Sequence, residues 1–352
     1  MPDWTRSMQQ TYEFYIVDPG TWTDKALLTE VVSGSGVRDL DSETLGSATF
    51  SITEDIGECY LRVYLVTVQD GIRDRTPIGT YLCQTPGRSF DGMVTSIDVD
   101  AYTPLIELKE KNPPLGYSVA RGRNILDVGS RLVAENLRAP VVAASGSPTL
   151  YSNFVADVDE NWLEYVKSLL AEAQHEIMLD DYGRVLFAPI QSLNALRPKW
   201  TFDDGNSSIL YPEIQLERDL YGVPNVVEVV YSKDDHYLYS KATNKDPNSP
   251  VSTVSRGREI MKRISDPDLP GTPTQEILDQ YARTQLREVS SLEYTITYTH
   301  GYCPVTVGDC VRLNYERAGL MDVKAKIVRQ NIKFEPGCPV EETAVFSSTL
   351  WG

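Results

Sequence analysis

The stretch from Ala156 to Val230 constrains the fold more than any other part of the chain. Apolar residues recur at helical spacing from Asn161 to Glu176, which predicts an amphipathic helix with Asp159 as its N-cap. Two short strands around the Asp-Asp-Tyr-Gly turn at 180–183 then predict a hairpin. No part of the stretch has the spacing of a catalytic or metal site, so it predicts an architectural element.

The hydrophobic period changes twice along the chain. Residues 1–104 form short strand-like runs separated by turn residues, and residues 60–68 alternate as a strand with one packed face and one wetter face would. Residues 105–198 carry helical spacing, as at 124–137. Strand-like runs return in 199–352, where a loop rich in Asn, Asp, Pro and Ser leads into a second helical segment.

These patterns predict a mainly β protein with α/β insertions. We expect two similar antiparallel β-barrel (tube-like) domains at 1–104 and 199–352. A small α/β module at 105–198 separates them, and a loop–helix insertion at about 240–292 interrupts the second barrel. The similar rhythm of the two β regions suggests a cryptic duplication.

Charge and composition limit the classes of partner. Lys and Arg number 33 and Asp and Glu 50, which gives a net charge of −17. Such a chain repels nucleic acid on average, so the charge indicates either solubility or a surface past which a polyanion slides. The apolar runs are too short to span a bilayer, and the N-terminus has no signal-peptide pattern. We expect synthesis in the cytoplasm without export and no membrane insertion.

The cysteines indicate neither a disulfide framework nor a zinc site. Their number is odd and no Cys-x-x-Cys occurs, so reduced thiols are expected. Cys59 and Cys83 lie in strand-like runs and are expected to act as small buried hydrophobes. The five are Cys59, Cys83, Cys303, Cys310 and Cys338.

No catalytic, cofactor-binding or metal-binding residue is predicted. The three histidines, His175, His236 and His300, are scattered, and no Gly-x-Ser-x-Gly motif occurs. The carboxylate pairs at 180–181 and 203–204 stand in Gly-containing turns, where Asp bonds to nearby backbone amides. Ser-Gly-Ser-Gly at 33–36 matches no phosphate-binding motif. We therefore expect no enzyme and no cofactor.

Some aromatic and basic residues are candidates for a subunit interface. Trp4 and Trp351 stand near the two ends of the sequence, where nothing local explains burial, and aromatic side chains of this kind anchor interfaces. Two basic pairs would either dock acidic neighbours or remain solvated. The candidates are Trp4, Trp22, Trp351, Arg121, Arg123, Arg256 and Arg258.

Three segments together give the chain a family resemblance. They are the strand–hairpin–strand at 81–110, the helix–hairpin at 161–189 and the strand-rich segment at 209–232. In order and local shape the chain, from about residue 12 to 346, resembles the tail hub (baseplate hub) family of tailed bacteriophages. That family is related to the spike proteins of contractile injection systems.

The resemblance implies a structural role in the virion tail tip. Members of the family are homotrimers in which each chain contributes two barrels, giving a ring with pseudo-six-fold symmetry. One side of that ring would meet a hexameric tail tube or distal tail protein, and the other a central fibre or spike, or the tape measure protein. DNA would pass through an acidic channel without specific binding.

Two alternatives remain open at this stage. A tail-tip cell-wall hydrolase would need a cleft with two carboxylates at catalytic separation. A carbohydrate- or receptor-binding β module would present exposed aromatic platforms on a monomer. Because the sequence stops at Gly352 without a fibre or peptidase segment, we expect that a separate protein handles penetration or receptor binding, or that the host-contacting activity is minimal.

Overall fold

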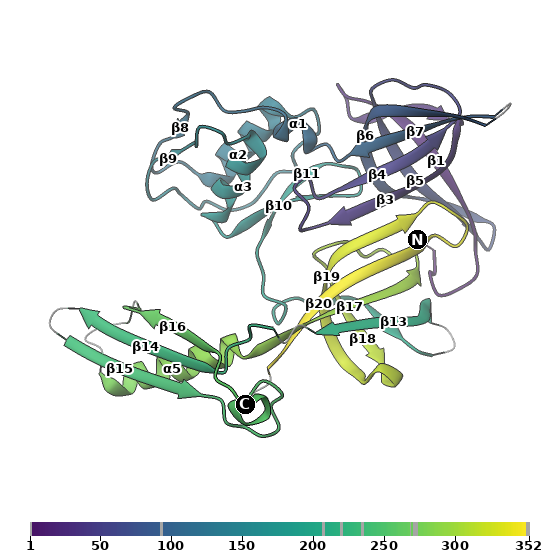
Figure 1. Cartoon of the computed structure of the whole chain (residues 1–352). Helices are drawn as coiled ribbons and strands as arrows, with labels where there is room; N and C mark the ends of the chain where they lie inside the picture. Colours follow the sequence, from purple (N-terminus) through teal and green to yellow (C-terminus); the bar gives the residue numbers. More distant parts are fainter. Residues whose placement is uncertain are drawn as a thin grey trace. The chain divides into compact units, whose positions relative to one another are not determined.

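The computed structural model describes residues 2–91, 94–205, 208–218, 221–233, 236–267, 269 and 274–349. The chain forms two compact units. Unit 1 comprises Met1–Ile214 and Tyr298–Thr343, and unit 2 comprises Gln215–Thr297 and Ala344–Gly352. The fold is mainly β with a few short helices, as the periodicity predicted (Figure 1). The three-part division at 104 and 198 remains a prediction.

Unit 1 begins with a series of consecutive strands and then alternates helices with short strands. The first strands are β1 (Gln9–Asp18), β2 (Thr23–Leu28), β3 (Val31–Asp39), β4 (Gly46–Ile52), β5 (Cys59–Gln69), β6 (Ile72–Asp91) and β7 (Val94–Tyr102). The next elements are α1 (Ile106–Lys109), β8 (Ser118–Val119), α2 (Ile125–Asn136), β9 (Phe154–Val155), α3 (Trp162–Ala171), β10 (His175–Leu179), β11 (Val185–Pro189) and β12 (Pro198–Asp203).

In the later part of the chain, the boundaries between the two units fall within three strands. These are β13 (Leu210–Arg218), β17 (Ser291–Gly301) and β20 (Pro339–Thr349). Unit 1 also contains β18 (Cys310–Tyr315), the 3-10 turn η1 (Glu316–Ala318) and β19 (Leu320–Lys333). Unit 2 contains β14 (Val226–Lys233), β15 (His236–Thr243), α4 (Thr253–Arg256), β16 (Met261–Ser265) and α5 (Gln275–Val289).

One large sheet joins the two β regions that the sequence separates. Its strand order is β13-β17-β20-β19-β3-β4-β7-β6-β5-β1-β2, and β18 pairs with both β12 and β19. The link is the antiparallel pairing of β3 with β19, in register from Asp39 opposite Arg329 to Ser35 opposite Lys333. Strands on either side of the predicted α/β module therefore share backbone hydrogen bonds within unit 1.

The central strand β5 departs from its predicted pattern. Its residues 60–66 are all buried, so the wetter face expected from their alternation is wrong. The reason is tertiary, because the Tyr60 face of β5 packs into a core shared with α1, α2 and α3. The turn predicted at 69–71 is confirmed: Asp70 and Gly71 have φ of 52° and 79°, the left-handed values of a tight hairpin. The turn predicted at 90–92 falls partly outside the described residues.

Aromatic rings fill the space enclosed by β1, β3 and β4. The Phe14 ring on β1 lies 6.1 Å from that of Phe50 on β4 and 6.3 Å from that of Phe334. The Ser-Gly-Ser-Gly segment at 33–36 runs along β3 beside these rings. A Cβ on Gly34 would lie 2.8 Å from Phe50 and 3.0 Å from Phe334. The glycines are thus explained by close packing against aromatic rings.

The helices of unit 1 begin at side-chain caps. Asn124 caps α2 by accepting hydrogen bonds from the amides of Leu126 and Asp127. Asn161 caps α3, and Glu164 returns a bond to the Asn161 amide to complete a capping box. The predicted cap at Asp159 is wrong because the helix begins at Trp162, where only Asn161 is positioned to reach the third helical amide.

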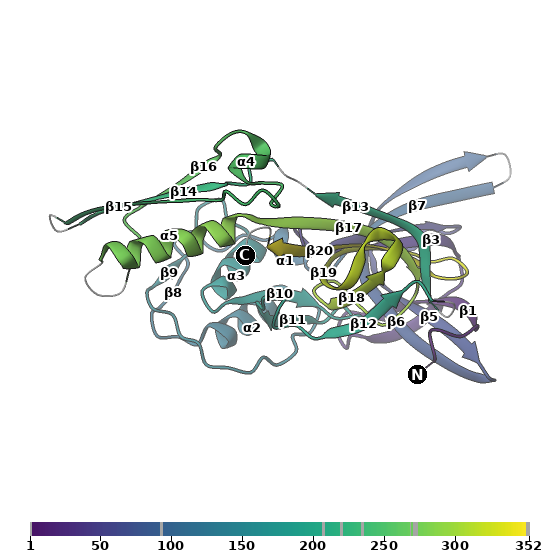
Figure 2. The ribbon, with the colours of Figure 1, turned by 90° about the horizontal axis from the view of Figure 1, so that it is seen from below.

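Unit 2 is a three-stranded sheet covered on one face by a helix. The strand order is β15-β14-β16, and α5 lies along this sheet (Figure 2). The core consists of Val227, Val229, Ala242, Leu278, Ala282 and Leu286. The helix predicted from Thr274 to Val289 is confirmed, with the Thr274 hydroxyl accepting from the Ile277 amide at its start.

The packing of the β3 glycines makes a stability prediction. We expect Gly34→Ala to lower the free energy of unfolding by about 1–3 kcal/mol, because the added methyl overpacks a filled aromatic core. Ser33→Ala, at the exposed neighbouring position, is the control and should change it by less than about 0.5 kcal/mol. Guanidinium unfolding curves measure both variants. Equal midpoints for the two would refute the packing argument.

Candidate functional site

The tip of the β10–β11 hairpin is held in shape by Asp180. One carboxylate oxygen accepts from the amides of Tyr182 and Arg184 at 3.0 and 2.8 Å. The other accepts from Arg184 Nε at 2.6 Å. The sequence-based assignment of Asp180 to turn formation is confirmed.

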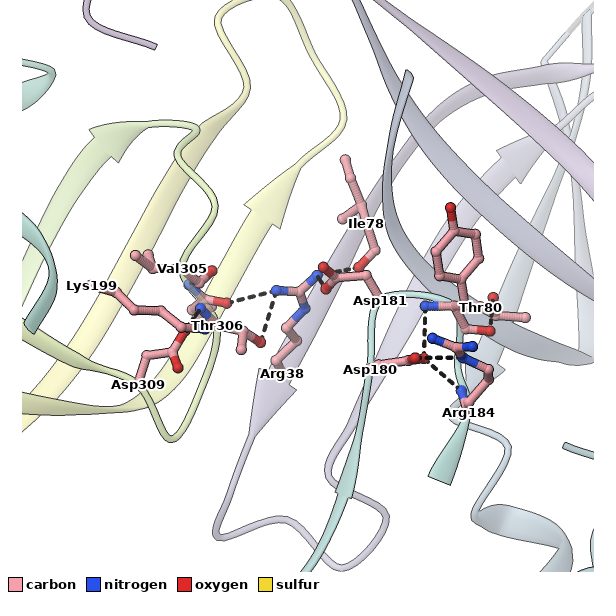
Figure 3. Close-up of polar contacts among 12 residues, drawn as sticks. Arg38, Ile78, Thr80, Asp180, Asp181, Arg184, Lys199, Val305, Thr306 and Asp309 are labelled. Atoms are coloured by element: carbon pink, nitrogen blue, oxygen red, sulfur yellow. Dashed lines mark hydrogen bonds and ion pairs between the residues drawn. The ribbon is translucent and has the colours of Figure 1, made fainter. Parts of the chain in front are cut away.

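Asp181, the next residue, has a different role. Its carboxylate forms an ion pair with the guanidinium of Arg38 on β3 at 2.7 Å (Figure 3). Arg38 also donates to the Thr306 hydroxyl at 3.0 Å, to Gln330 Oε1 at 3.1 Å and to the Ile78 carbonyl. The prediction that turn chemistry explains Asp181 is therefore wrong, since its carboxylate connects the hairpin to the sheet through Arg38.

The ion pair between Asp181 and Arg38 is partly withdrawn from water. The Arg38 side chain is 12% exposed and that of Asp181 41% exposed. Burial raises the pKa of the Asp181 carboxyl, and the neighbouring Arg38 charge opposes this rise. A cavity of about 40 Å³ lies beside the pair, a volume on the order of one water molecule. Asp181 also lines a larger pocket of about 440 Å³, together with Lys199 and Asp309.

A second arginine, Arg62, binds the hairpin by donating to a backbone carbonyl. The Tyr182 carbonyl accepts from Trp22 Nε1 at 2.8 Å, from the Thr80 hydroxyl at 2.9 Å and from Arg62 Nη2 at 3.3 Å. The side chain of Arg62 is only 3% exposed, and its charge is balanced by Asp24 at 2.8 Å. The half-buried Arg38 and the buried Arg62 thus contact adjacent residues of the same turn.

The network continues into the core behind Gln330. Gln330 Nε2 donates to Glu342, which also accepts from the Tyr298 hydroxyl at 2.6 Å. Burial and then the Glu342 charge raise the pKa of Tyr298 well above its ordinary value. Hydrogen bonds therefore run without a break from Asp181 through Arg38 and Gln330 to Tyr298. We call this chain, with Thr306 and Arg62, the polar junction.

One cluster at the end of the polar junction has the order of a thiol-hydrolase triad. Cys303 Sγ lies 3.9 Å from His300 Nδ1, and His300 Nε2 lies 3.2 Å from a carboxylate oxygen of Glu342. However, Cys303 is 1% exposed and the other two are fully buried. Burial also raises the pKa of the Cys303 thiol, which disfavours the nucleophilic thiolate. The cluster therefore lacks the solvent access and the thiolate that this chemistry requires.

Other candidates for chemistry are also explained by local structure. Asp203 accepts a hydrogen bond from the Gly205 amide at 2.9 Å, as its turn assignment predicted. Within the described ranges, no group of three or more His, Cys, Asp or Glu side chains is placed to hold a metal ion. No helix in the described part of the chain is both long enough and apolar enough to cross a membrane.

Two of the predicted interface tryptophans lie inside unit 1. Trp4 is 7% exposed and stands edge-on to Tyr302 at 5.0 Å. Trp22 is 9% exposed, packs on Tyr60 at 4.8 Å and donates to the Tyr182 carbonyl. The expectation that nothing buries Trp4 is wrong, because the N-terminal segment folds back onto the unit. Trp351 lies outside the described residues.

The predicted basic candidates are more accessible. Arg121 and Arg123 are exposed in the loop before α2, and the Arg121 guanidinium lies 5.8 Å from the Tyr151 ring centre. In unit 2, Arg256 is half-buried and donates to the Val223 carbonyl at 2.9 Å, while Arg258 is exposed. The structure does not bring the two basic pairs together within one unit, and their interface role remains a prediction.

Sequence patterns alone did not identify the main residues of the polar junction. Arg62 carried a readable signal, because a charge inside the apolar run Tyr60–Val66 has to be paired once the strand is buried. Arg38 and Asp181 carried none, since they are 143 residues apart and each stands in a polar context.

Solved structures share this fold. A tail protein from Neisseria meningitidis MC58 aligns over 97% of this chain and 98% of its own, with a TM-score of 0.63 and 14% identity. The 43 kDa tail protein of prophage MuSo2 from Shewanella oneidensis aligns over 95% and 98%, with a TM-score of 0.63 and 11% identity. A chain of the Francisella PdpA–VgrG complex aligns over 96% of this chain and 53% of its own, with a TM-score of 0.55 and 10% identity.

At the level of sequence, no family model matches the chain, and neither does any curated protein. The likeness to the solved structures is therefore one of fold. The protein has the fold of these tail proteins, and two of the alignments extend over nearly the whole of both chains.

The polar junction makes a second stability prediction. We expect Arg38→Met to lower the free energy of unfolding by about 3 kcal/mol, the lower end for breaking a buried pair, because Asp181 keeps partial access to water. In a double-mutant cycle with Asp181→Asn, the coupling energy should exceed about 1 kcal/mol. Urea unfolding of the four proteins measures both quantities.

The control for this cycle is Arg329→Met. Arg329 is 56% exposed and lies 3.7 Å from Asp39, so its loss should cost less than about 0.5 kcal/mol. A coupling energy between Arg38 and Asp181 below about 0.5 kcal/mol, the level expected for an exposed pair, would contradict the assignment of the polar junction as a stabilising contact.

Proposed function

We propose that this chain is a structural tail hub protein of a bacteriophage tail tip or baseplate. In this proposal three copies form a ring with pseudo-six-fold symmetry, which joins a tail tube or distal tail ring to a central fibre or spike. The protein acts through its shape and contacts and has no catalytic function.

The observation that carries the proposal is the extent of the fold likeness. The alignment with the Neisseria tail protein takes in 97% of this chain and 98% of that protein. A likeness of a single β domain would leave long parts of either chain unmatched. Here the alignment covers nearly the whole of both chains, which supports the proposal of a shared architectural role.

The internal construction suits a ring subunit. A ring subunit that bears force at its contacts with neighbouring subunits has to keep its two β regions in a fixed arrangement. In unit 1 the β3–β19 pairing and the polar junction provide this, because they combine backbone hydrogen bonds with a desolvated ion pair. Edge strands such as β2, at one end of the large sheet, are natural sites for contacts between copies.

The charge suits passage of DNA. With a net charge of −17 the chain offers few phosphate-binding groups relative to its carboxylates. A channel lined by acidic side chains would let DNA move without being captured. We therefore expect acidic residues to gather on the channel face of the ring, with DNA, the tube and the fibre or spike as partners in the virion.

The oligomeric state tests the proposal. Light scattering coupled to size-exclusion chromatography should give a mass three times that of the 39.4 kDa chain, and electron micrographs should show rings. A protein that stays monomeric over the accessible concentration range would contradict the ring. A reconstruction with a basic lumen and an acidic exterior would contradict the channel.

The non-enzymatic role has a separate test. In a zymogram with bacterial cell wall as substrate, the protein should leave no cleared band, because Asp180 and Asp203 are occupied by turn hydrogen bonds. A lysozyme lane is the positive control. A cleared band that co-migrates with the chain would favour a tail-tip hydrolase instead.

A further inference from the structure

Two of the five cysteines face each other across neighbouring strands. In the antiparallel pairing of β5 with β6, Cys59 stands directly opposite Cys83. Residues directly opposite in such a pair point their side chains to the same face of the sheet. On its other side Cys83 is opposite Ala101 of β7, a small residue that adds little crowding.

The spacing of facing residues fits a disulfide. Opposed residues in antiparallel strands have Cα atoms about 4.5 Å or about 5.5 Å apart, depending on their place in the ladder. Both values lie within the range of about 4.4–6.8 Å that disulfides span. The Cα spacing of Cys59 and Cys83 in this register is therefore compatible with a disulfide.

The two thiols differ in access and in acidity. Cys59 is half-buried, whereas Cys83 is fully buried. A hydrogen bond from the Cys83 thiol lowers the pKa of Cys59, although burial opposes this. The same contact, followed by burial, raises the pKa of Cys83. Cys59 is thus the accessible attacking thiol, and Cys83 is held beside it as the resolving thiol.

We propose that Cys59 and Cys83 form a reversible oxidation site, which closes to a cross-strand disulfide when the protein meets a small disulfide oxidant such as glutathione disulfide. The Cys59 thiolate attacks one sulfur of glutathione disulfide, and one glutathione thiolate leaves. Cys83 then gives up its proton and attacks the Cys59 sulfur, which releases the second glutathione. The protein loses two electrons, and one glutathione disulfide becomes two glutathione thiols.

The other cysteines do not share this arrangement. Cys303, Cys310 and Cys338 are all buried. Cys310 on β18 is opposite Lys326 of β19, and Cys303 contacts His300. In the strand registers of the described residues, Cys59 and Cys83 are the only cysteines that stand opposite each other. Oxidation is therefore expected at one pair.

The site is independent of the tail hub role. A disulfide between Cys59 and Cys83 would close the loop of chain that contains the β5–β6 hairpin, and would restrict the unfolded state more than the folded one. It would stay open in a reducing compartment and close in an oxidising one. The intact strands would thereby gain resistance to unfolding after exposure to oxidant.

Thiol counting tests the proposal directly. The purified full-length protein is incubated with glutathione disulfide at mildly alkaline pH, freed of reagent and titrated with Ellman's reagent in denaturant. Free thiols should fall from five to three. Peptide mass spectrometry without reduction should find Cys59 linked to Cys83. The melting temperature should rise on oxidation and return after dithiothreitol.

Matched variants sharpen the result. Cys59→Ser should keep all four of its thiols, and Cys59→Ala serves the same purpose. Cys310→Ser, which removes a cysteine that faces Lys326 and no other cysteine in the described strand registers, should lose two of its four thiols. Five free thiols in the treated wild type would overturn the proposal. So would a glutathione adduct that stays on Cys59, or a disulfide between any other pair.

Discussion

The charge of Arg38 is the constraint around which unit 1 is arranged. A guanidinium that is almost removed from water has to meet acceptors on all sides, and the acceptors here come from distant parts of the chain. Asp181 lies in a hairpin, Ile78 in β6, and Thr306 and Gln330 around β18 and β19. None of these segments can move without leaving a donor or acceptor unsatisfied. One side chain thus couples the registers of three separate pieces of β structure.

The sequence predicted the parts of this fold whose causes are local. The α5 helix, the β10–β11 hairpin and the Asp180 turn follow from spacing and turn chemistry within a few residues. Contacts between segments that are distant in the sequence could not be predicted from such local patterns. The ion pair of Arg38 with Asp181, the burial of Trp4 and the second buried face of β5 all depend on segments that meet only after folding. The predicted N-cap at Asp159 was wrong for a local reason, because Asn161 is nearer to the start of α3.

The residues of the polar junction were not predicted. The absence of catalytic spacing indicated an architectural chain, which remains a prediction, and the polar junction is an arrangement that holds segments in place. The triad-like order of Cys303, His300 and Glu342 shows why side-chain identity alone is a poor guide. A nucleophile that attacks a molecule from solution needs a route to solvent, and burial removes that route from Cys303. Arg62 was the one member that the sequence could have revealed, because an unpaired charge is not tolerated in a buried strand.

One contact between the β10–β11 hairpin and the sheet is made through a main-chain carbonyl, a group that every amino acid has. The side chains of Trp22, Thr80 and Arg62 all donate to the main-chain carbonyl of Tyr182. This contact therefore depends on the path of the backbone. Substitution at 182 leaves that acceptor in place, while the three donors each depend on their own side chain. At this one contact the requirement for particular residues therefore falls on the sheet and not on position 182. The contact can persist while the side chain at 182 changes, although Asp181 and Gly183 on either side of it remain constrained by the Arg38 ion pair and by close packing against Thr80.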